Sequence, residues 1–236
     1  MNHILVFPEE ARQGRLNLKD ARAQHILRIL KITPSGSFRM GVLNESKGIA
    51  TLHGTDARFL SFSYHQQEKP EDLLPVTLLM GATRPIVLSR ILRDATAFGV
   101  QRFLITHTEN SEKSYLQSRL WQNEQYRQPI YEGLALARGV TMPSVQRCFS
   151  LGEALKQVNS SCRILAEENA KDKLSQLQYS LPFTLAVGPE RGFTAGEITF
   201  LQTHGFAGGR MGNRILRSET ACFTALSAAC CAAGLF

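Results

Sequence analysis

The sequence has 236 residues, of which 43% are hydrophobic and 20% charged, and its formal net charge is +7. This length suffices for one large domain or two small ones with a sizeable core. No stretch reaches the roughly 18 consecutive apolar residues of a membrane span, and Met1-Asn2-His3 lacks the pattern of a secretory signal peptide, so we expect neither. The positive charge is consistent with an anionic partner such as nucleic acid. It is equally consistent with a basic surface that has no binding role.

Cysteine and histidine usage argues against disulfides and metals. The cysteines are odd in number and form no C-x-x-C pair; they are Cys148, Cys162, Cys222, Cys230 and Cys231. This usage predicts reduced thiols in a cytoplasmic protein. The six histidines are scattered and pair with no cysteine at ligand spacing, so no metal is expected.

The first 68 residues have the pattern of a small β-rich domain. A short helix is expected at Asp20–Lys31, where Asp20 can cap the first turn and apolar residues recur at helical spacing. Turns are expected at Thr33–Gly36 and Asn44–Gly48. The predicted strands are Ile4–Phe7, Ser37–Leu43, Ile49–His53 and Phe59–His65.

After a polar linker at residues 69–75, the pattern changes to alternating strands and helices over residues 76–236. This alternation predicts an α/β domain with a parallel sheet flanked by helices. Helices are expected at Pro85–Phe98 and Tyr115–Ala137, the second interrupted before Pro129. The predicted strands are Val76–Met80, Arg102–Thr106, Arg163–Ala166 and Phe183–Val187.

Two glycine-rich loops stand close together near the end of the chain. The first is Gly188-Pro-Glu-Arg-Gly192, and Thr194 and Glu197 then have the spacing of a capping box for a helix that ends near Gly205. The second holds Gly208, Gly209 and Gly212 and leads to a helix of small residues, for which Ser218 is the expected N-cap. Paired glycine loops predict close approach of the backbone to a ligand. The Walker and dinucleotide-binding patterns are absent.

The same two loops carry a specific resemblance. Val187-Gly-Pro-Glu-Arg-Gly-Phe-Thr-Ala-Gly-Glu197 and Met211-Gly-Asn-Arg-Ile-Leu-Arg-Ser-Glu-Thr-Ala221 resemble the paired signature of the RsmE family, in the SPOUT class of methyltransferases. His25-Ile-Leu-Arg-Ile-Leu-Lys31 with Gly36 is similar to the start of that family. The resemblance implies a deep trefoil knot in the α/β domain, a PUA-like β-barrel at residues 1–68, and a homodimer. It also implies methylation of N3 of a uridine in 16S ribosomal RNA of the small ribosomal subunit.

The resemblance further implies a set of site residues. S-adenosylmethionine would be held by Leu185, Val187, Gly188, Pro189, Glu190, Gly192, Met211, Gly212, Ile215 and Leu216. Arg217 would hold a phosphate or orient the uracil, and Glu219 would orient Arg217 or cap the last helix; these two are the candidate catalytic residues. Loss of the N3 proton requires a base or a cation that stabilises the uracil anion, and the residues do not choose between them. The candidate RNA-binding residues are His25, Arg28, Lys31 and Arg138.

The middle of the chain departs from the family pattern. The family's lysine and glutamate are replaced by Asp94 and Ala97, and its Glu, Gln and Arg by Ala135, Leu136 and Gly139. Arg138 stands one position from the missing arginine, and Arg84, Arg90 and Arg93 form either a new basic face or a merely solvated one. The alternative to the enzyme is therefore a knotted RNA-binding protein with a changed RNA target or lost catalysis. A small-molecule methyltransferase is disfavoured by the positive charge and the β-rich front domain.

Overall fold

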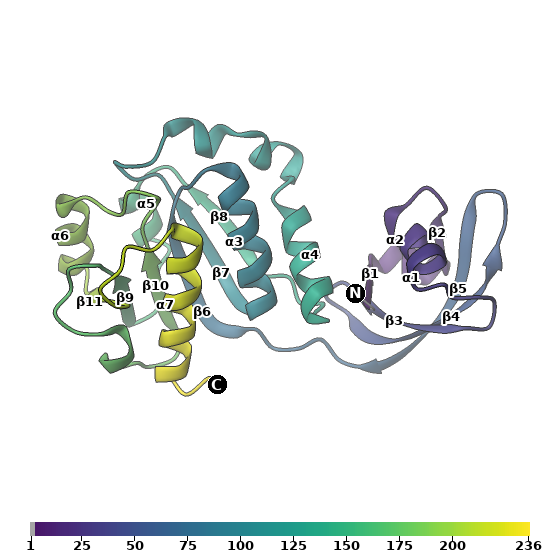
Figure 1. Cartoon of the computed structure of the whole chain (residues 1–236). Coiled ribbons are helices and arrows are strands. Elements are labelled where there is room, and N and C mark those ends of the chain that lie inside the picture. The colour runs from purple at the N-terminus through teal and green to yellow at the C-terminus, as the bar shows by residue number, and fades with distance from the viewer. Residues whose placement is uncertain (1–2) are drawn as a thin grey trace. The chain divides into compact units, whose positions relative to one another are not determined.

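The computed structural model describes residues 3–236, which fall into two compact units. The first unit comprises the chain up to Asp72 together with Tyr131–Met142, and the second comprises Leu73–Ile130 and Pro143–Phe236. The first unit thus includes a second segment that the predicted boundaries at 1–68 and 76–236 leave out. Figure 1 labels the elements of both units.

The first unit is built on a five-stranded sheet in the order β1-β3-β4-β5-β2. β1 and β3 are parallel, and the other neighbours are antiparallel. Leu60 and Phe62, which alternate with serines on β5, are buried. The barrel implied by the resemblance stays a prediction, since β1 and β2 form the two ends of the pairing order. The strands are β1 His3–Val6, β2 Arg15–Asn17, β3 Ser37–Val42, β4 Ser46–Thr55 and β5 Phe59–Glu68.

Two short helices cover this sheet. α2 spans Ala21–Gln24, and the Asp20 carboxylate accepts a hydrogen bond from the Arg22 amide, which confirms the predicted cap. The helix then widens into a π-turn at His25–Ile29 and ends before Lys31, whose φ of 53° is left-handed. α1 (Pro8–Gln13) and β2 were not predicted. The connection between them needs Gly14, because a Cβ there would lie 2.6 Å from the Phe62 carbonyl oxygen.

The second unit is built on a six-stranded sheet in the order β11-β9-β10-β6-β7-β8, with every neighbouring pair parallel. This confirms the predicted α/β class with a parallel sheet. β8 and β11 were not predicted because they are short and lack apolar runs. The strands are β6 Leu74–Gly81, β7 Val100–Thr106, β8 Ser144–Cys148, β9 Cys162–Ala166, β10 Phe183–Val187 and β11 Ala207–Gly209.

Helices cover both faces of this sheet. α3 and α7 lie side by side on one face, with α7 against β10 and α3 against β7 (Figure 1). On the other face, α5 and α6 contribute Leu151, Ala154 and Leu201 to a core with Leu79 and Ala186 from the strands. The helices of this unit are α3 Pro85–Phe98, α5 Leu151–Leu155, α6 Ala195–Thr203 and α7 Ser218–Ala232.

The predicted helical stretch Tyr115–Ala137 is interrupted before Pro129, as expected, but its first half is not α-helical. The structure has two 3₁₀ helices, Lys113–Gln117 and Arg119–Glu124, followed by α4 at Arg127–Ala137. Asn123 and Glu124 adopt left-handed φ values of 48° and 53°, which break the helix. Pro129 lies in the first turn of α4, where its missing N–H costs no helical hydrogen bond.

Two further predictions concern membranes and metals. Across residues 3–236, none of the helices combines the length and apolar character that crossing a bilayer requires. The same residues hold no group of three or more His, Cys, Asp or Glu side chains suited to a metal ion. All five cysteines are unpaired.

Candidate functional site at the carboxyl ends of the parallel strands

The first glycine loop follows directly from the carboxyl end of β10. All five residues of β10 are buried, and β6 and β7 end at the same edge of the sheet. In open α/β sheets this edge is where ligands bind. Of the predicted cofactor residues, Leu185 and Val187 belong to this strand, and Gly188, Pro189, Glu190 and Gly192 belong to the loop.

The loop is tightly folded around its two glycines. A Cβ on Gly188 would lie 2.9 Å from the Gly192 Cα and 2.9 Å from the Phe193 amide nitrogen. Gly192 has a left-handed φ of 69°, and its amide donates to the Pro189 carbonyl at 2.9 Å. The end of β6 approaches just as closely, since a Cβ on Gly81 would lie 2.5 Å from the Pro189 Cδ. The glycines therefore set the loop shape.

Neighbouring strand ends fix this loop through hydrogen bonds. The Glu190 carboxylate accepts from the Arg84 amide at 2.9 Å, just before α3 begins. The Asn110 side-chain amide donates to the Gly192 and Arg191 carbonyls at 3.0 and 3.3 Å. The Glu190 carboxylate thus joins the loop to α3, a structural contact distinct from the cofactor contact that the resemblance implied. Asn110 was missed because nothing in its neighbourhood marks it.

Glu197 connects the helix after the loop to the end of β7. Glu197 is 8% exposed, and its carboxylate accepts a hydrogen bond from the Glu109 amide at 2.8 Å. It also accepts from the Thr194 amide at 2.9 Å, while the Glu197 amide donates to the Thr194 hydroxyl. The predicted capping box is therefore confirmed, and its acidic member has an additional long-range partner.

We expect Glu197→Ala to destabilise the fold by about 2–3 kcal/mol, because two amides lose a charged acceptor and one of them lies far away in sequence. Thr194→Ala removes only the local cap and should cost about 1 kcal/mol. Urea unfolding of both variants measures the difference. Equal losses would mean that the Glu109 contact contributes nothing.

The second glycine loop leaves β11 and runs to α7. The Arg210 amide donates to the Asp172 carbonyl at 2.9 Å, and its carbonyl accepts from the Leu174 amide at 3.0 Å. Beyond this point, within residues 3–236, we find no hydrogen bond to the peptide groups of residues 211–216. Ile215 is 84% exposed. Four predicted cofactor residues, Met211, Gly212, Ile215 and Leu216, thus lie in a segment whose backbone donors and acceptors are available to a ligand.

The start of α7 differs from the prediction in two ways. The N-cap is Arg217, with extended φ and ψ of −66° and 151°, and Ser218 is the first helical residue with a buried hydroxyl. Ser218 was expected at the cap because serine favours it, but Arg217 already has the extended backbone of that position. Glu219 pairs with Arg90 of α3 at 3.1 Å rather than with Arg217. Arg217 is exposed.

α3 contacts both the first loop and helix α7, and it carries two of the predicted basic residues. The Arg84 amide, just before its first turn, donates a hydrogen bond to the Glu190 carboxylate. Arg90, in the helix itself, forms an ion pair with Glu219 of α7. Arg93 pairs with Asp94 at 2.6 and 3.0 Å. Asp94, which stands where the family has a lysine, therefore neutralises its neighbour, and both α3 guanidinium groups have acidic partners.

The predicted RNA-binding residues lie in the first unit on separate segments. His25 and Arg28 belong to the π-turn, and Lys31 follows it. Arg138 directly follows α4 and lines a cavity together with His3 and Arg39. His25, Arg28 and Lys31 do not line this cavity. No sequence signal pointed to His3 or Arg39.

His3, in the lining of this cavity, makes the stability of the folded protein depend on pH. Burial, with further contributions from Lys47 and Arg138, lowers the pKa of His3 to about 4. The unfolded chain takes up a proton near pH 6.5 that the folded chain resists, so stability falls as the pH drops from about 6.5 to 4. His3→Gln should flatten this part of the profile in urea unfolding measured at matched pH values. Parallel profiles for wild type and variant would refute the assignment.

Fold and site together define an α/β protein with two glycine loops at the carboxyl ends of a parallel sheet. Residues 69–230 match the family model described as RNA methyltransferase domain, so the chain belongs to this family. It is 30% identical over 94% of its length to "Ribosomal RNA small subunit methyltransferase E" of Treponema pallidum, 87% of which is covered. It is also 29% identical to "Ribosomal RNA small subunit methyltransferase E 1" of Borreliella burgdorferi, with 95% of each chain covered. The resemblance to the RsmE family is therefore confirmed.

Solved structures show the same fold. The putative methyltransferase Lpg2936 from Legionella pneumophila, in complex with its bound cofactor SAM, superposes with a TM-score of 0.81 at 18% identity, covering 98% of each chain. Ribosomal RNA small subunit methyltransferase E from Neisseria gonorrhoeae, bound to S-adenosyl methionine, gives a TM-score of 0.78 at 22% identity, covering 98% of this chain and 97% of that one.

Proposed function

We propose that this protein methylates N3 of a uridine in 16S ribosomal RNA of the small ribosomal subunit, with S-adenosylmethionine as the methyl donor. The observation that carries the proposal is the pair of loops in the second unit, Gly188–Gly192 and residues 211–216; the first contacts the start of α3, and the second leads into α7, whose Glu219 pairs with Arg90 of α3. Membership of the RNA methyltransferase family and the names of the relatives support the substrate class. The target base and atom come from the resemblance of the motifs.

The chemistry of the loops fits the cofactor. The side-chain-free Gly188 lets the first loop fold back on Gly192, and the unpaired peptide groups of residues 211–216 supply donors and acceptors for an adenine edge. When bound, S-adenosylmethionine supplies an electrophilic methyl group. We assign its binding to the ten residues named from the resemblance, with Glu190 acting through its contact with the Arg84 amide.

Arg217 is the residue we assign to the target base. Methylation at N3 requires loss of the imide proton, which leaves negative charge on the uracil ring. An exposed guanidinium at the start of α7 can stabilise that charge and hold the ring by paired hydrogen bonds. Glu219 has a positioning role in this scheme, because its carboxylate binds Arg90 and holds the first turn of α7 against α3.

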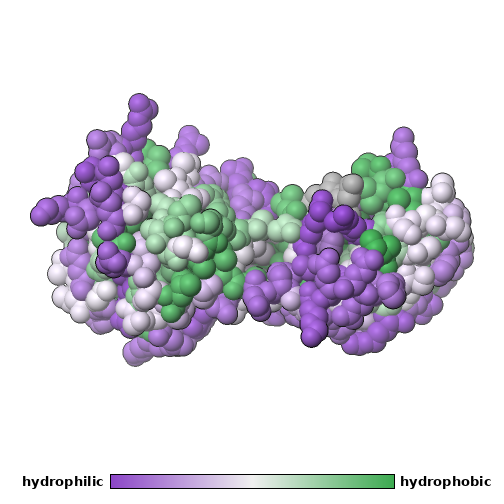
Figure 2. All heavy atoms as spheres, turned by 90° about the horizontal axis from the view of Figure 1, so that it is seen from below, coloured by the Kyte–Doolittle hydropathy of each residue, from purple (hydrophilic) through white to green (hydrophobic). Residues whose placement is uncertain are grey.

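The resemblance also suggests a knotted homodimer with a PUA-like first domain, working in the cytoplasm. α7 supports the dimer: it is rich in small residues, and Figure 2 shows hydrophobic residues gathered on the surface of the second unit. Sedimentation equilibrium tests this part of the proposal. A monomer at micromolar concentration would contradict it.

Two experiments test the activity. Titration calorimetry of the folded protein with S-adenosylmethionine should give one binding event per chain, and its absence would refute the proposal. Mass mapping of ribosomal RNA from a deletion strain should then show one missing methyluridine, restored by the wild-type gene.

A second candidate function is RNA binding with a changed target or lost catalysis. It is favoured by the replacement of the family's Glu, Gln and Arg by Ala135, Leu136 and Gly139, and by the pairing of Arg90 with Glu219 and of Arg93 with Asp94, which leaves α3 without a compensating basic face. In that case the deletion strain would have an unchanged map of ribosomal RNA, while the purified protein would still bind RNA.

A further inference from the structure

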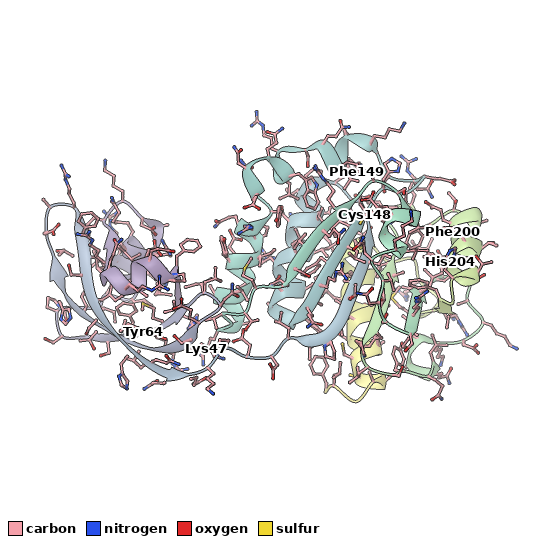
Figure 3. The ribbon with its side chains drawn as sticks, turned by 180° about the vertical axis from the view of Figure 1, so that it is seen from behind. Lys47, Tyr64, Cys148, Phe149, Phe200 and His204 are labelled. Carbon is pink, nitrogen blue, oxygen red and sulfur yellow. The ribbon has the colours of Figure 1, made fainter. Side chains whose placement is uncertain are left out.

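The first unit contains a cavity of about 390 Å³ that the proposed chemistry does not use. Strands β1, β3, β4 and β5 form its floor, and the end of α4 contributes the rest. Figure 2 shows hydrophilic residues gathered on the face of this unit, and Figure 3 labels Lys47 on β4. The polar side chains of the lining are His3, Arg39, Lys47, Gln67, Glu68 and Arg138.

Strand register places the basic residues on one face of the sheet. His3 pairs with Arg39 across β1 and β3, and Gly41 pairs with Lys47 across β3 and β4. Gly41 is required between them, since a Cβ there would lie 2.5 Å from both the His3 Nε2 and the Val140 Cγ1. The glycine therefore makes room for the histidine ring.

His3 is buried with an unused hydrogen-bonding atom. It is 6% exposed, and its Nε2 has no partner within residues 3–236. Buried polar atoms normally have a partner, and exceptions call for a functional or structural reason. The His3 Nε2 lies against Gly41 and is shielded from the cavity, so the groups that can reach a ligand are the other basic side chains of the lining.

The charges around the cavity are unevenly compensated. The Lys47 ammonium lies 3.2 Å from a Glu71 oxygen and 3.7 Å from a Glu68 oxygen. Glu71 is itself held by the amides of Val140 and Thr141 at 2.8 and 3.0 Å. Within the described part of the chain, neither Arg39 nor Arg138 has an acidic partner. Two guanidinium groups therefore remain for an anion.

The backbone of Arg138 is unfavourable for an arginine. Its φ of 57° is left-handed, at the end of α4, where glycine is the usual residue. A side chain at the next position would displace Glu71, because a Cβ on Gly139 would lie 2.8 Å from a Glu71 carboxylate oxygen. An arginine at position 139 would disturb the Glu71 contacts, whereas an arginine at position 138 keeps them at the cost of left-handed backbone strain.

We propose that this cavity binds one backbone phosphate of the RNA substrate, held by Arg39, Lys47 and Arg138. Arginine forks match phosphate oxygens in geometry and charge. The proposal rests on the proposed function only for its choice of RNA; inorganic phosphate has the same chemistry and serves as a probe.

The test compares binding of a single-stranded RNA oligonucleotide by wild type and Arg138→Gly over a range of salt concentrations. We expect the variant to bind about 5- to 10-fold more weakly at 0.1 M salt, with a salt slope smaller by about 0.7, the value for one lost phosphate contact on a single strand. Its melting temperature should rise by roughly 2–4 °C, because glycine relieves the left-handed strain. A purely structural role for Arg138 would not give weaker binding together with higher stability.

Matched variants complete the test. Arg39→Gln should weaken RNA binding like Arg138→Gly, whereas Arg58→Gln, an exposed arginine of the same unit outside the cavity, should change it less than twofold. Replacing chloride by inorganic phosphate at equal ionic strength should compete with RNA in wild type and not in Arg138→Gly. Equal losses for Arg39→Gln and Arg58→Gln, or equal competition in both proteins, would overturn the proposal.

Calorimetry with S-adenosylmethionine separates this proposal from the proposed function. If the cofactor binds but Arg138→Gly leaves RNA affinity and salt slope unchanged, the phosphate site alone is refuted. If the cofactor does not bind, the methyltransferase proposal fails, and the comparison of RNA affinities still decides on the cavity.

Discussion

Arg217→Ala is expected to lower kcat for RNA methylation by about 100- to 1000-fold, the usual effect of removing one group that stabilises charge in a transition state. The Kd for S-adenosylmethionine should change by less than about threefold. The reason is position: the side chain is exposed at the N-cap of α7, and the resemblance assigns the cofactor to the loops before it. Single-turnover methylation and calorimetry measure the two quantities.

Arg214→Ala is the matched control, because Arg214 is a second exposed arginine in the same loop. It should lower kcat by less than about threefold, which separates a specific contact with the base from a general loss of positive charge. Arg217→Lys keeps the charge but loses the planar fork, so an intermediate rate is expected. If cofactor affinity collapses in Arg217→Ala while kcat at saturation is unchanged, the assignment to the base is wrong.

Local signals explain what could be predicted from the sequence. The capping box of α6 depends on two residues three positions apart, and Gly205 ends the following turn with a left-handed φ of 83°. The apolar run of β10 and the periodicity of α3 are equally local, and both elements formed with the predicted bounds. Long elements with a single strong pattern are the most predictable part of a chain.

Contacts between distant segments explain what could not be predicted. The Glu190 carboxylate accepts a hydrogen bond from the Arg84 amide, and the Glu219 carboxylate accepts one from the Arg90 guanidinium; in each case the partners are more than a hundred residues apart in the sequence. The return of Tyr131–Met142 to the first unit depends on Glu71, whose carboxylate accepts from the amides of Val140 and Thr141. None of these pairings leaves a periodic signal in the sequence. The return of the second segment to the first unit and the pairing of Glu219 with Arg90 could therefore not be predicted from the sequence.

Gly188→Ala is expected to weaken S-adenosylmethionine binding by about 100-fold. The added Cβ would lie within 3.0 Å of three backbone atoms of Gly192 and Phe193, none of which can rotate away. Overpacking of this kind costs on the order of 3 kcal/mol when the backbone must move, which corresponds to about two powers of ten in affinity if the loop shape is part of the site. Calorimetry gives the Kd, and thermal unfolding shows whether the rest of the chain stays folded.

Gly192→Ala is the informative comparison because it changes the same loop by the same methyl group. The Cβ on Gly192 meets nothing within 4 Å, and the only cost is the left-handed φ of 69°, about 1 kcal/mol. Affinity for S-adenosylmethionine should therefore fall by about fivefold at most. A larger loss for Gly192→Ala than for Gly188→Ala would mean that backbone conformation at position 192, rather than the close packing of Gly188, determines how the loop receives its ligand.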